Sequence, residues 1–267
     1  MPKIKALSGK NRVNKYPSKT PHPLAQSLEP SVPETQYVAL LDQFNLKTDT
    51  EFDANLYTVL LNLSEGVRLN RVMREWVLLN SNATCINSSV LRTYYTIEAE
   101  HYLAKFESSN DPIFVISATD QFNLCGMDDR AVELLQKHVY IRTNKNKKIG
   151  AFYCLAYATS LYALRKFEDA KTMALASVEL SKKEIATCML LGAIYLHLGL
   201  VRDSIHWYER AQAIGADAEE CDEAMRNAVK IVTLSKRHIV IQELYSLHTR
   251  YKFLRGLLPQ KKRGYLR

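Results

Sequence analysis

Cysteine and histidine are the residues of this 267-residue chain that most readily carry out covalent or metal chemistry. The five cysteines lie 29 to 40 residues apart and form no C-x-x-C pair, so their spacing indicates neither a zinc site nor a redox motif. The closest histidine pairs are nine and ten residues apart, whereas two ligands on one helical face lie about four residues apart. We therefore expect no metal, and we assign the cysteines to core packing.

The sequence motifs of common enzymes are missing too. The chain contains no H-E-x-x-H, G-x-S-x-G, G-x-x-x-x-G-K or G-x-G-x-x-G. Its nine glycines leave little material for a loop that cradles phosphate. We expect a non-enzymatic protein with no cofactor; clustered acids or a Cys–His pair in a groove would favour an enzyme instead.

Charge is distributed unevenly along the chain. The net charge is +8, but residues 1–28 carry +6 and residues 244–267 carry +7 with no acid in either range, which leaves −5 for residues 29–243. Basic ends attract RNA, DNA or an acidic protein surface through charge alone, or they serve only as solubilising ends. The candidate contacts are Lys3, Lys5, Lys10, Arg12, Lys15, Lys19, Lys261, Lys262, Arg263 and Arg267.

Proline content and periodicity divide the chain. Six of the eight prolines fall in residues 1–33, where no helical or strand period appears, and this range is expected to be a disordered, Pro-rich basic arm. Residues 34–110 are expected to form an N-terminal helical region of degenerate repeats or a cap. Residues 111–257 are expected to form a helical repeat domain, and 258–267 a basic C-terminal tail. With 47% apolar residues the chain is expected to be globular.

The sequence predicts no membrane span and no secretory signal. The longest apolar stretch, residues 188–201, is interrupted by His197 and is shorter than the roughly 20 residues that a span requires. We expect a soluble, intracellular protein, cytoplasmic rather than nuclear. An organellar transit peptide within residues 1–28 is the alternative.

Helices are predicted before the repeats by apolar spacing and capping residues. A capping pattern at residues 31–34 precedes an apolar run, and further helices are expected at about 52–63, 65–80 and 87–107. Residues 110–112 can cap a following helix, whereas residues 113–116 are rich in β-branched side chains and suit a short strand. We expect a helix here, because no partner strand is visible elsewhere in the sequence. Another helix is expected from Asp128 through Val139, followed by a basic loop from Arg142 to Lys148.

An internal repeat of 34 residues relates residues 151–184 to residues 185–218. Each unit has two amphipathic halves around a short polar turn, Arg165-Lys166 in the first unit and Gly199 in the second. Residues 217–230 are expected to form the first helix of a third unit. Residues 238–254 are expected to form either its partner or a long capping helix. The matched pairs are Leu155 with Met189, Tyr157 with Leu191, Ala158 with Gly192, Leu161 with Tyr195, Phe167 with Val201, Ala170 with Ser204, Ala174 with Tyr208, and Leu180 with Ile214.

These repeats resemble the tetratricopeptide repeat (TPR) family, most fully in the second unit. The resemblance implies an antiparallel helix-turn-helix solenoid, with small residues where the two helices of a unit, helix A and helix B, cross closely. The chain departs from the family at the proline after helix B, which is Lys182 or Ala216 here, and at the early tryptophan, which is Cys154 or Cys188.

The resemblance also implies a partner groove along the A helices. When the family's pattern of groove positions is transferred to this sequence, the groove residues are Phe152, Leu155, Thr159, Tyr162, Ala186, Met189, Ala193 and His197. Such a groove suits a peptide or a helix of another protein, unless a helix of the same chain covers it. The carboxylate clamp of chaperone-binding TPR domains is missing from these positions.

We therefore expect a protein–protein interaction adaptor, a chaperone or an assembly factor that holds a partner segment. At the level of the repeat it resembles small TPR chaperones and regulators of bacterial secretion systems. The alternative is a nucleic-acid-associated scaffold anchored through its basic N- and C-terminal tails. The sequence does not determine the oligomeric state.

Overall fold

The computed structural model describes residues 34–257, apart from residues 49, 84 and 248. Within these ranges the chain forms twelve α-helices, two short 3-10 helices and no strand, so the expected all-α fold class is confirmed. The Cα packing separates two compact units between Leu134 and Leu135. The expected N-terminal arm and C-terminal tail lie outside the described residues.

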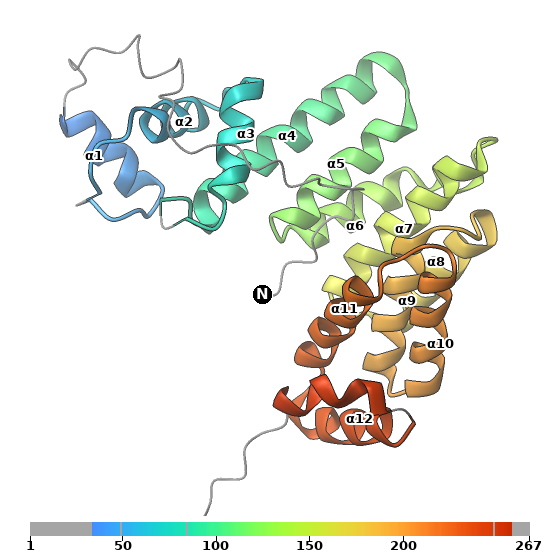
Figure 1. Cartoon of the computed structure of the whole chain (residues 1–267). Helices are drawn as coiled ribbons and strands as arrows, with labels where there is room; N and C mark the ends of the chain where they lie inside the picture. The colour runs from blue at the N-terminus through green and yellow to red at the C-terminus, as the bar shows by residue number, and fades with distance from the viewer. Residues whose placement is uncertain (1–33, 49, 84, 248, 258–267) are drawn as a thin grey trace, which may run out of the picture. The chain divides into compact units, whose positions relative to one another are not determined.

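The first unit, from residue 34 to residue 134, contains α1 to α5 and most of α6 (Figure 1). Aspartate or asparagine precedes each of α2 to α5, and its side-chain oxygen accepts a backbone N–H of the first turn, which satisfies a donor that the helix leaves unpaired. The helices are α1 (Glu34–Gln43), α2 (Ala54–Ser64), α3 (Arg71–Leu79), α4 (Ser88–Ser109), α5 (Pro112–Leu124) and α6 (Asp128–Lys137).

The strand considered for residues 113–116 does not form, because Asp111 caps a helix there and Pro112 occupies its first turn. The resulting α5 packs along α4, with Ala99 of α4 and Ala118 of α5 both inaccessible to solvent. A larger buried cluster joins α1 to α4. Its fully enclosed members include Leu41, Leu56, Leu60, Val77 and Val90.

The second unit consists of consecutive helix pairs. Figure 1 shows α7 and α8, then α9 and α10, running back and forth beside one another. The elements are η2 (Val139–Thr143), α7 (Lys147–Ala163), α8 (Phe167–Leu180), α9 (Ile185–Leu198), α10 (Val201–Ala213), α11 (Ala218–Ile231), α12 (Leu234–Leu247) and η3 (Thr249–Leu257).

The 34-residue period recurs in the backbone of this unit. The second helix of each pair begins at Phe167 and at Val201, which are the residues matched in sequence. The turns between paired helices contain Arg165 and Gly199, both with positive φ, at 61° and 81°. The left-handed conformation is natural for glycine and costs free energy for arginine, so the two turns share a geometry despite different residues.

The small residues of the second repeat lie where its helices cross. The Ser204 hydroxyl of α10 donates to the Gly192 carbonyl of α9 at 2.7 Å. A methyl group at Gly192 would lie 2.6 Å from a ring carbon of Tyr208, which is closer than a carbon atom can approach. The close crossing therefore depends on the missing side chain at position 192.

Buried hydroxyl groups link one helix pair to the next. The Ser177 hydroxyl of α8 donates to the Ala151 carbonyl of α7 and lies 3.1 Å from the Thr187 hydroxyl of α9. The Tyr153 hydroxyl of α7 donates to the Leu135 carbonyl of α6 at 2.7 Å. These side chains are buried, so their hydrogen bonds fix the stacking of successive elements.

Four expected boundaries differ from the observed ones. The basic loop expected from Arg142 to Lys148 is shorter, because α7 already begins at Lys147, where Asn146 caps it. The helix expected over residues 65–80 begins at Arg71, because Gly66 turns the chain with a φ of 69° and Asn70 caps the helix. The helix expected to run through Val139 ends at Lys137. The long final helix expected over residues 238–254 begins at Leu234 and is divided into α12 and η3.

Among the described residues, no helix combines the length and the apolar character needed to cross a bilayer.

Candidate interaction site

One stripe of side chains follows α7 on the face that the sequence assigns to a partner. Phe152, Leu155, Thr159 and Tyr162 lie three or four residues apart, which places them along one side of the helix. The first three are half-buried, whereas Tyr162 is only 6% exposed. The accessible part of the stripe therefore consists of its first three residues.

The corresponding stripe on α9 consists of Ala186, Met189, Ala193 and His197. The helices α7 and α9 contact each other, although a whole helix separates them in the chain. Their stripes converge at one end, where the Tyr162 hydroxyl lies 3.0 Å from Nε2 of His197 in a buried hydrogen bond. Both stripes thus belong to one surface.

Aromatic packing closes this end of the surface. The Phe167 ring of α8 stacks on His197 with centroids 4.4 Å apart and planes 11° apart, and it meets Tyr162 edge to face at 5.6 Å. Burial, together with the nearby Arg165 cation, lowers the pKa of His197 to about 4. His197 is therefore neutral at pH 7 and suits a packed aromatic site.

The structure divides the eight predicted groove residues into two groups. Tyr162, Met189 and His197 are at most 9% exposed and pack within the protein. The other five residues are half-buried and remain reachable from solvent. We call these five the A-helix face: Phe152, Leu155 and Thr159 of α7, with Ala186 and Ala193 of α9.

The cysteines of the repeats lie within the helix packing. Cys154, Cys188 and Cys221 are at most 1% exposed. Burial raises the pKa of Cys154 to about 11 and also raises the pKa of Cys188. Both thiols therefore stay protonated at neutral pH, which makes them poor nucleophiles and poor metal ligands. Among the described residues, no group of three or more His, Cys, Asp or Glu side chains is placed to hold a metal ion.

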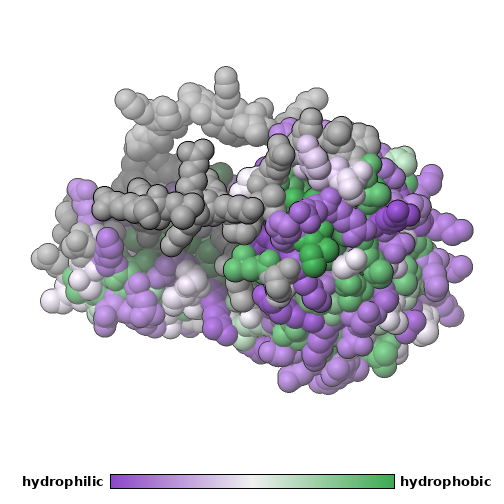
Figure 2. All heavy atoms as spheres, turned by 90° about the horizontal axis from the view of Figure 1, so that it is seen from below, coloured by the Kyte–Doolittle hydropathy of each residue, from purple (hydrophilic) through white to green (hydrophobic). Residues whose placement is uncertain are grey.

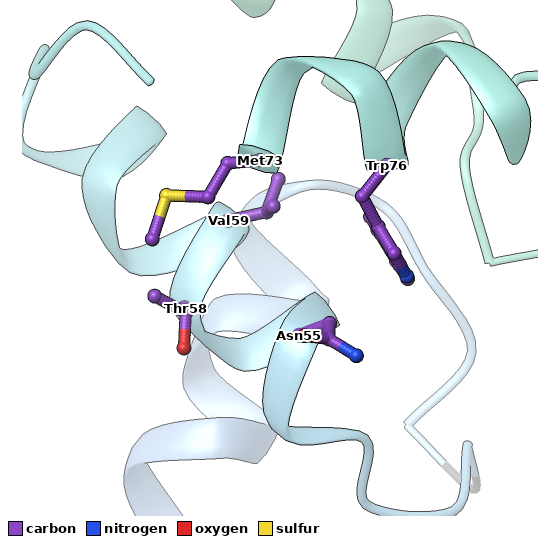
Figure 3. Close-up of a pocket in the computed structure, with 5 residues that line it drawn as sticks. All are labelled: Asn55, Thr58, Val59, Met73 and Trp76. Carbon is purple, nitrogen blue, oxygen red and sulfur yellow. The ribbon is translucent and has the colours of Figure 1, made fainter. Parts of the chain in front are cut away.

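A shallow pocket lies between α2 and α3 in the first unit (Figure 3). Met73 and Trp76 of α3 face Asn55, Thr58 and Val59 of α2. The lining contains no ionisable side chain, and the Thr58 hydroxyl already donates to the Ala54 carbonyl. This pocket therefore offers apolar contact and an amide but no acid–base chemistry.

A buried ion pair in the first unit has no counterpart among the motifs of the sequence. Glu98 of α4 is 4% exposed and accepts two hydrogen bonds from Arg68, at 2.9 and 2.8 Å, while Arg74 approaches it at 3.5 Å. The Glu98 hydrogen bond is the main cause that raises the pKa of Arg68. The sequence alone indicates only that Glu98 is a polar position within a helix. Arg74 and Arg68 lie 24 and 30 residues before it in the chain, and the fold brings them into contact with its carboxylate.

Large apolar side chains are also exposed outside the A-helix face. Figure 2 shows apolar side chains interspersed with polar ones on the visible face, rather than one continuous apolar surface. Scattered exposed apolar residues are usual for folded proteins. The most exposed examples are Leu79, Leu234, Ile239, Val139 and Tyr140.

The ten lysines and arginines assigned to nucleic acid or an acidic partner all lie in residues 1–33 or 258–267, outside the described residues. The described chain is an all-helical protein whose second unit is built from repeated helix pairs. A scan against protein-family models finds no match for the sequence, and a search of curated proteins finds no relative.

Proposed function

We propose that the protein is a non-enzymatic adaptor, chaperone or assembly factor that binds a segment of another protein on the A-helix face of a TPR-like repeat. The observation that carries this proposal is the pair of converging stripes on α7 and α9. Successive A helices that place apolar side chains on one surface suit an apolar helix or an extended peptide.

The chemistry of the face supports a peptide rather than a small polar ligand. Phe152 and Leu155 supply apolar area, and the alanines at 186 and 193 leave room for a partner's larger side chains. The Thr159 hydroxyl donates to the Leu155 carbonyl within α7, so it is already satisfied without a polar ligand. Phe152 also lies beneath the Lys148 ammonium, 5.6 Å from the ring centroid, which adds positive charge at one edge.

Two threonines provide a matched test of the A-helix face. Thr159 lies on the face, whereas Thr172 is exposed on α8, and each hydroxyl donates to the carbonyl four residues earlier, at 3.0 and 3.1 Å. Arginine at either position removes the same local hydrogen bond and adds the same charge and bulk. Only Thr159→Arg should obstruct a segment bound on the face.

The experiment compares affinity purifications of the wild-type chain, Thr159→Arg and Thr172→Arg, with circular dichroism to establish that all three fold. We expect a partner that copurifies with the wild type and Thr172→Arg and is lost with Thr159→Arg. A photo-crosslinking residue at Phe152 should then attach covalently to the same partner. Equal recovery with both arginine variants would refute the proposal for this face.

The second hypothesis, a nucleic-acid-associated scaffold anchored through the basic tails, is tested by deleting residues 1–28 and 258–267. This deletion should abolish the salt-sensitive contacts that the tails themselves make with nucleic acid and leave the partner on the A-helix face unaffected.

A further inference from the structure

A second basic region lies within the helical body, at the start of the second unit. Residues 135–167 contain seven lysines and arginines and no aspartate or glutamate. Five of the seven fall within residues 137–148, which we call the basic segment. It comprises the end of α6, the η2 turn and the start of α7, and its cations are Lys137, Arg142, Lys145, Lys147 and Lys148.

The cations of the basic segment are exposed and are not neutralised within the part of the chain that the structure describes. All five side chains are exposed, and none lies within 4.0 Å of a described carboxylate. By contrast, Arg68 and Arg74 of the first unit share the buried Glu98. The first turn of α7 adds the positive end of a helix dipole beside Lys147 and Lys148.

The backbone of the basic segment is anchored to the core. Ile141 is fully buried and lies between two exposed neighbours, Tyr140 and Arg142. Gly150 packs so closely that a methyl group there would lie 2.7 Å from the Arg142 carbonyl oxygen. The Asn146 side chain accepts the Lys148 backbone N–H and caps α7. The exposed side chains are thus presented from a held backbone, which lowers the entropy lost when they bind.

Two aromatic side chains, His138 and Tyr140, lie among these cations in the sequence. Tyr140 is 58% exposed, and its neighbour Val139 is 59% exposed. The Tyr140 hydroxyl is hydrogen-bonded to Nδ1 of His138 at 3.2 Å, and the two rings meet edge to face with centroids 5.8 Å apart. This contact orients the Tyr140 ring while leaving much of it open to solvent.

We infer that the basic segment binds the backbone of a single-stranded nucleic acid and that Tyr140 stacks against one of its bases. A single strand offers a phosphate charge and an accessible aromatic face at every nucleotide, which matches lysines and an arginine surrounding an exposed ring. A lipid surface would need a broader apolar face than Val139 and Tyr140 provide. An acidic peptide would satisfy the cations but would leave the ring without a matching group. This site is separate from the basic tails and does not depend on the A-helix face.

The test measures binding of a fluorescein-labelled oligoadenylate to the full chain by anisotropy over a series of salt concentrations. One variant reverses three charges of the segment, Arg142→Glu, Lys145→Glu and Lys147→Glu, and spares Lys148 because it contacts Phe152. The control reverses three exposed charges elsewhere in the same unit: Lys182→Glu, Lys183→Glu and Arg202→Glu. Both variants carry the same net charge and keep the tails.

We expect the segment variant to bind at least about tenfold more weakly than the control variant, because each lost phosphate contact reduces the electrostatic contribution. The slope of the logarithm of the affinity against the logarithm of the salt concentration should fall by about 2, at roughly 0.7 per phosphate on a single strand. Tyr140→Ala should weaken binding about tenfold through lost stacking, whereas Tyr140→Phe retains the ring and should bind like the wild type.

Three results would overturn the inference. Equal weakening in the segment and control variants would mean that overall charge alone attracts the strand. An unchanged affinity of Tyr140→Ala would remove the stacking contact. Tighter binding to anionic vesicles or to oligoglutamate than to oligoadenylate would assign the surface to a membrane or to an acidic protein.

Discussion

The Tyr162 hydroxyl and Nε2 of His197 lie 3.0 Å apart and join the first helices of two successive repeats through a buried hydrogen bond. The two residues are 35 positions apart in sequence, so the contact forms only when α7 and α9 stack side by side. Phe167 covers the imidazole from α8. The contacts among Tyr162, His197 and Phe167 therefore depend on the stacking of the two repeats.

Acid should weaken the fold through His197. Burial lowers its folded-state pKa to about 4, below its ordinary value of 6.5. The unfolded chain consequently takes up a proton first as the pH falls, and stability is lost from about pH 6.5 down to about pH 4. As the pH falls from 7.5 to 5.5, protonation of His197 in the unfolded chain should lower the free energy of unfolding by about 1 kcal/mol. Urea unfolding at the two pH values measures the loss.

His197→Gln supplies the control for this pH dependence, because glutamine keeps a polar group but does not titrate. The wild type should lose about 1 kcal/mol more than the variant over the same pH interval. His101 and His138, whose pKa values are also lowered mainly by burial, are present in both proteins and cancel in the difference. An identical pH dependence in the two proteins would show that His197 is not held neutral.

Alanine at Gly192 should destabilise the protein although it favours a helix. A helical glycine replaced by alanine usually gains up to about 1 kcal/mol. Here the added methyl group would lie 2.6 Å from the Tyr208 ring, which is 2% exposed and enclosed by the core, so we expect a net loss of about 1 to 2 kcal/mol. Thermal unfolding of Gly192→Ala beside Gly256→Ala tests this, because no atom lies within 4 Å of the added methyl group at Gly256. Equal transition temperatures would contradict the close crossing of α9 and α10.

Two buried tyrosines should respond in opposite directions to the loss of a hydroxyl group. The Tyr153 hydroxyl donates to the Leu135 carbonyl, whereas the Tyr208 hydroxyl is buried without a partner among the described residues. Tyr153→Phe should cost about 1 kcal/mol, and Tyr208→Phe should gain about 1 kcal/mol, because an unsatisfied buried hydroxyl is destabilising. Chemical denaturation measures both changes. A loss in Tyr208→Phe as large as that in Tyr153→Phe would reveal a hydrogen-bond partner, such as an internal water molecule.

Removing one member of the Arg68–Glu98 pair should destabilise the first unit more than replacing both. Arg68→Met leaves the buried carboxylate with Arg74 alone, at 3.5 Å, and we expect a loss of about 2 to 3 kcal/mol. The double variant Arg68→Met with Glu98→Met removes the charge that would be stranded and should recover most of this loss. Denaturation of the wild type, both single variants and the double variant gives the coupling energy. Additive losses would mean that the two side chains do not interact in solution.

Several elements could be predicted because their signals are local. The capping sequence before α5 and the spacing of apolar residues along α2 and α4 predict helices independently of the rest of the chain. The 34-residue period predicts where α8 and α10 begin, at Phe167 and Val201, because equivalent helices of a repeat keep the same register. The division of the final helix into α12 and η3 escaped prediction, because apolar spacing continues across the break.

The exposure of the candidate site residues, unlike the positions of these helices, could not be predicted from local signals. The sequence placed eight residues on the A-helix stripes, but exposure depends on what packs over each side chain, and Phe167 closes the Tyr162–His197 end. The ion pair at Glu98 could not be predicted either, because its two arginines lie 24 and 30 residues away in the chain and meet it only in the folded structure. The basic segment is visible in the sequence as charge, but its significance depends on exposed side chains that lack carboxylate partners among the described residues.

The sequence by itself determined that this chain is helical, that its second part repeats every 34 residues, and where most helices begin, since capping and apolar periodicity act within a few turns of the backbone. Only the tertiary structure decided which predicted surface residues are buried, which charges are paired and which rings remain open. Those properties arise from contacts between segments far apart in the chain, and no local pattern of residue types encodes them.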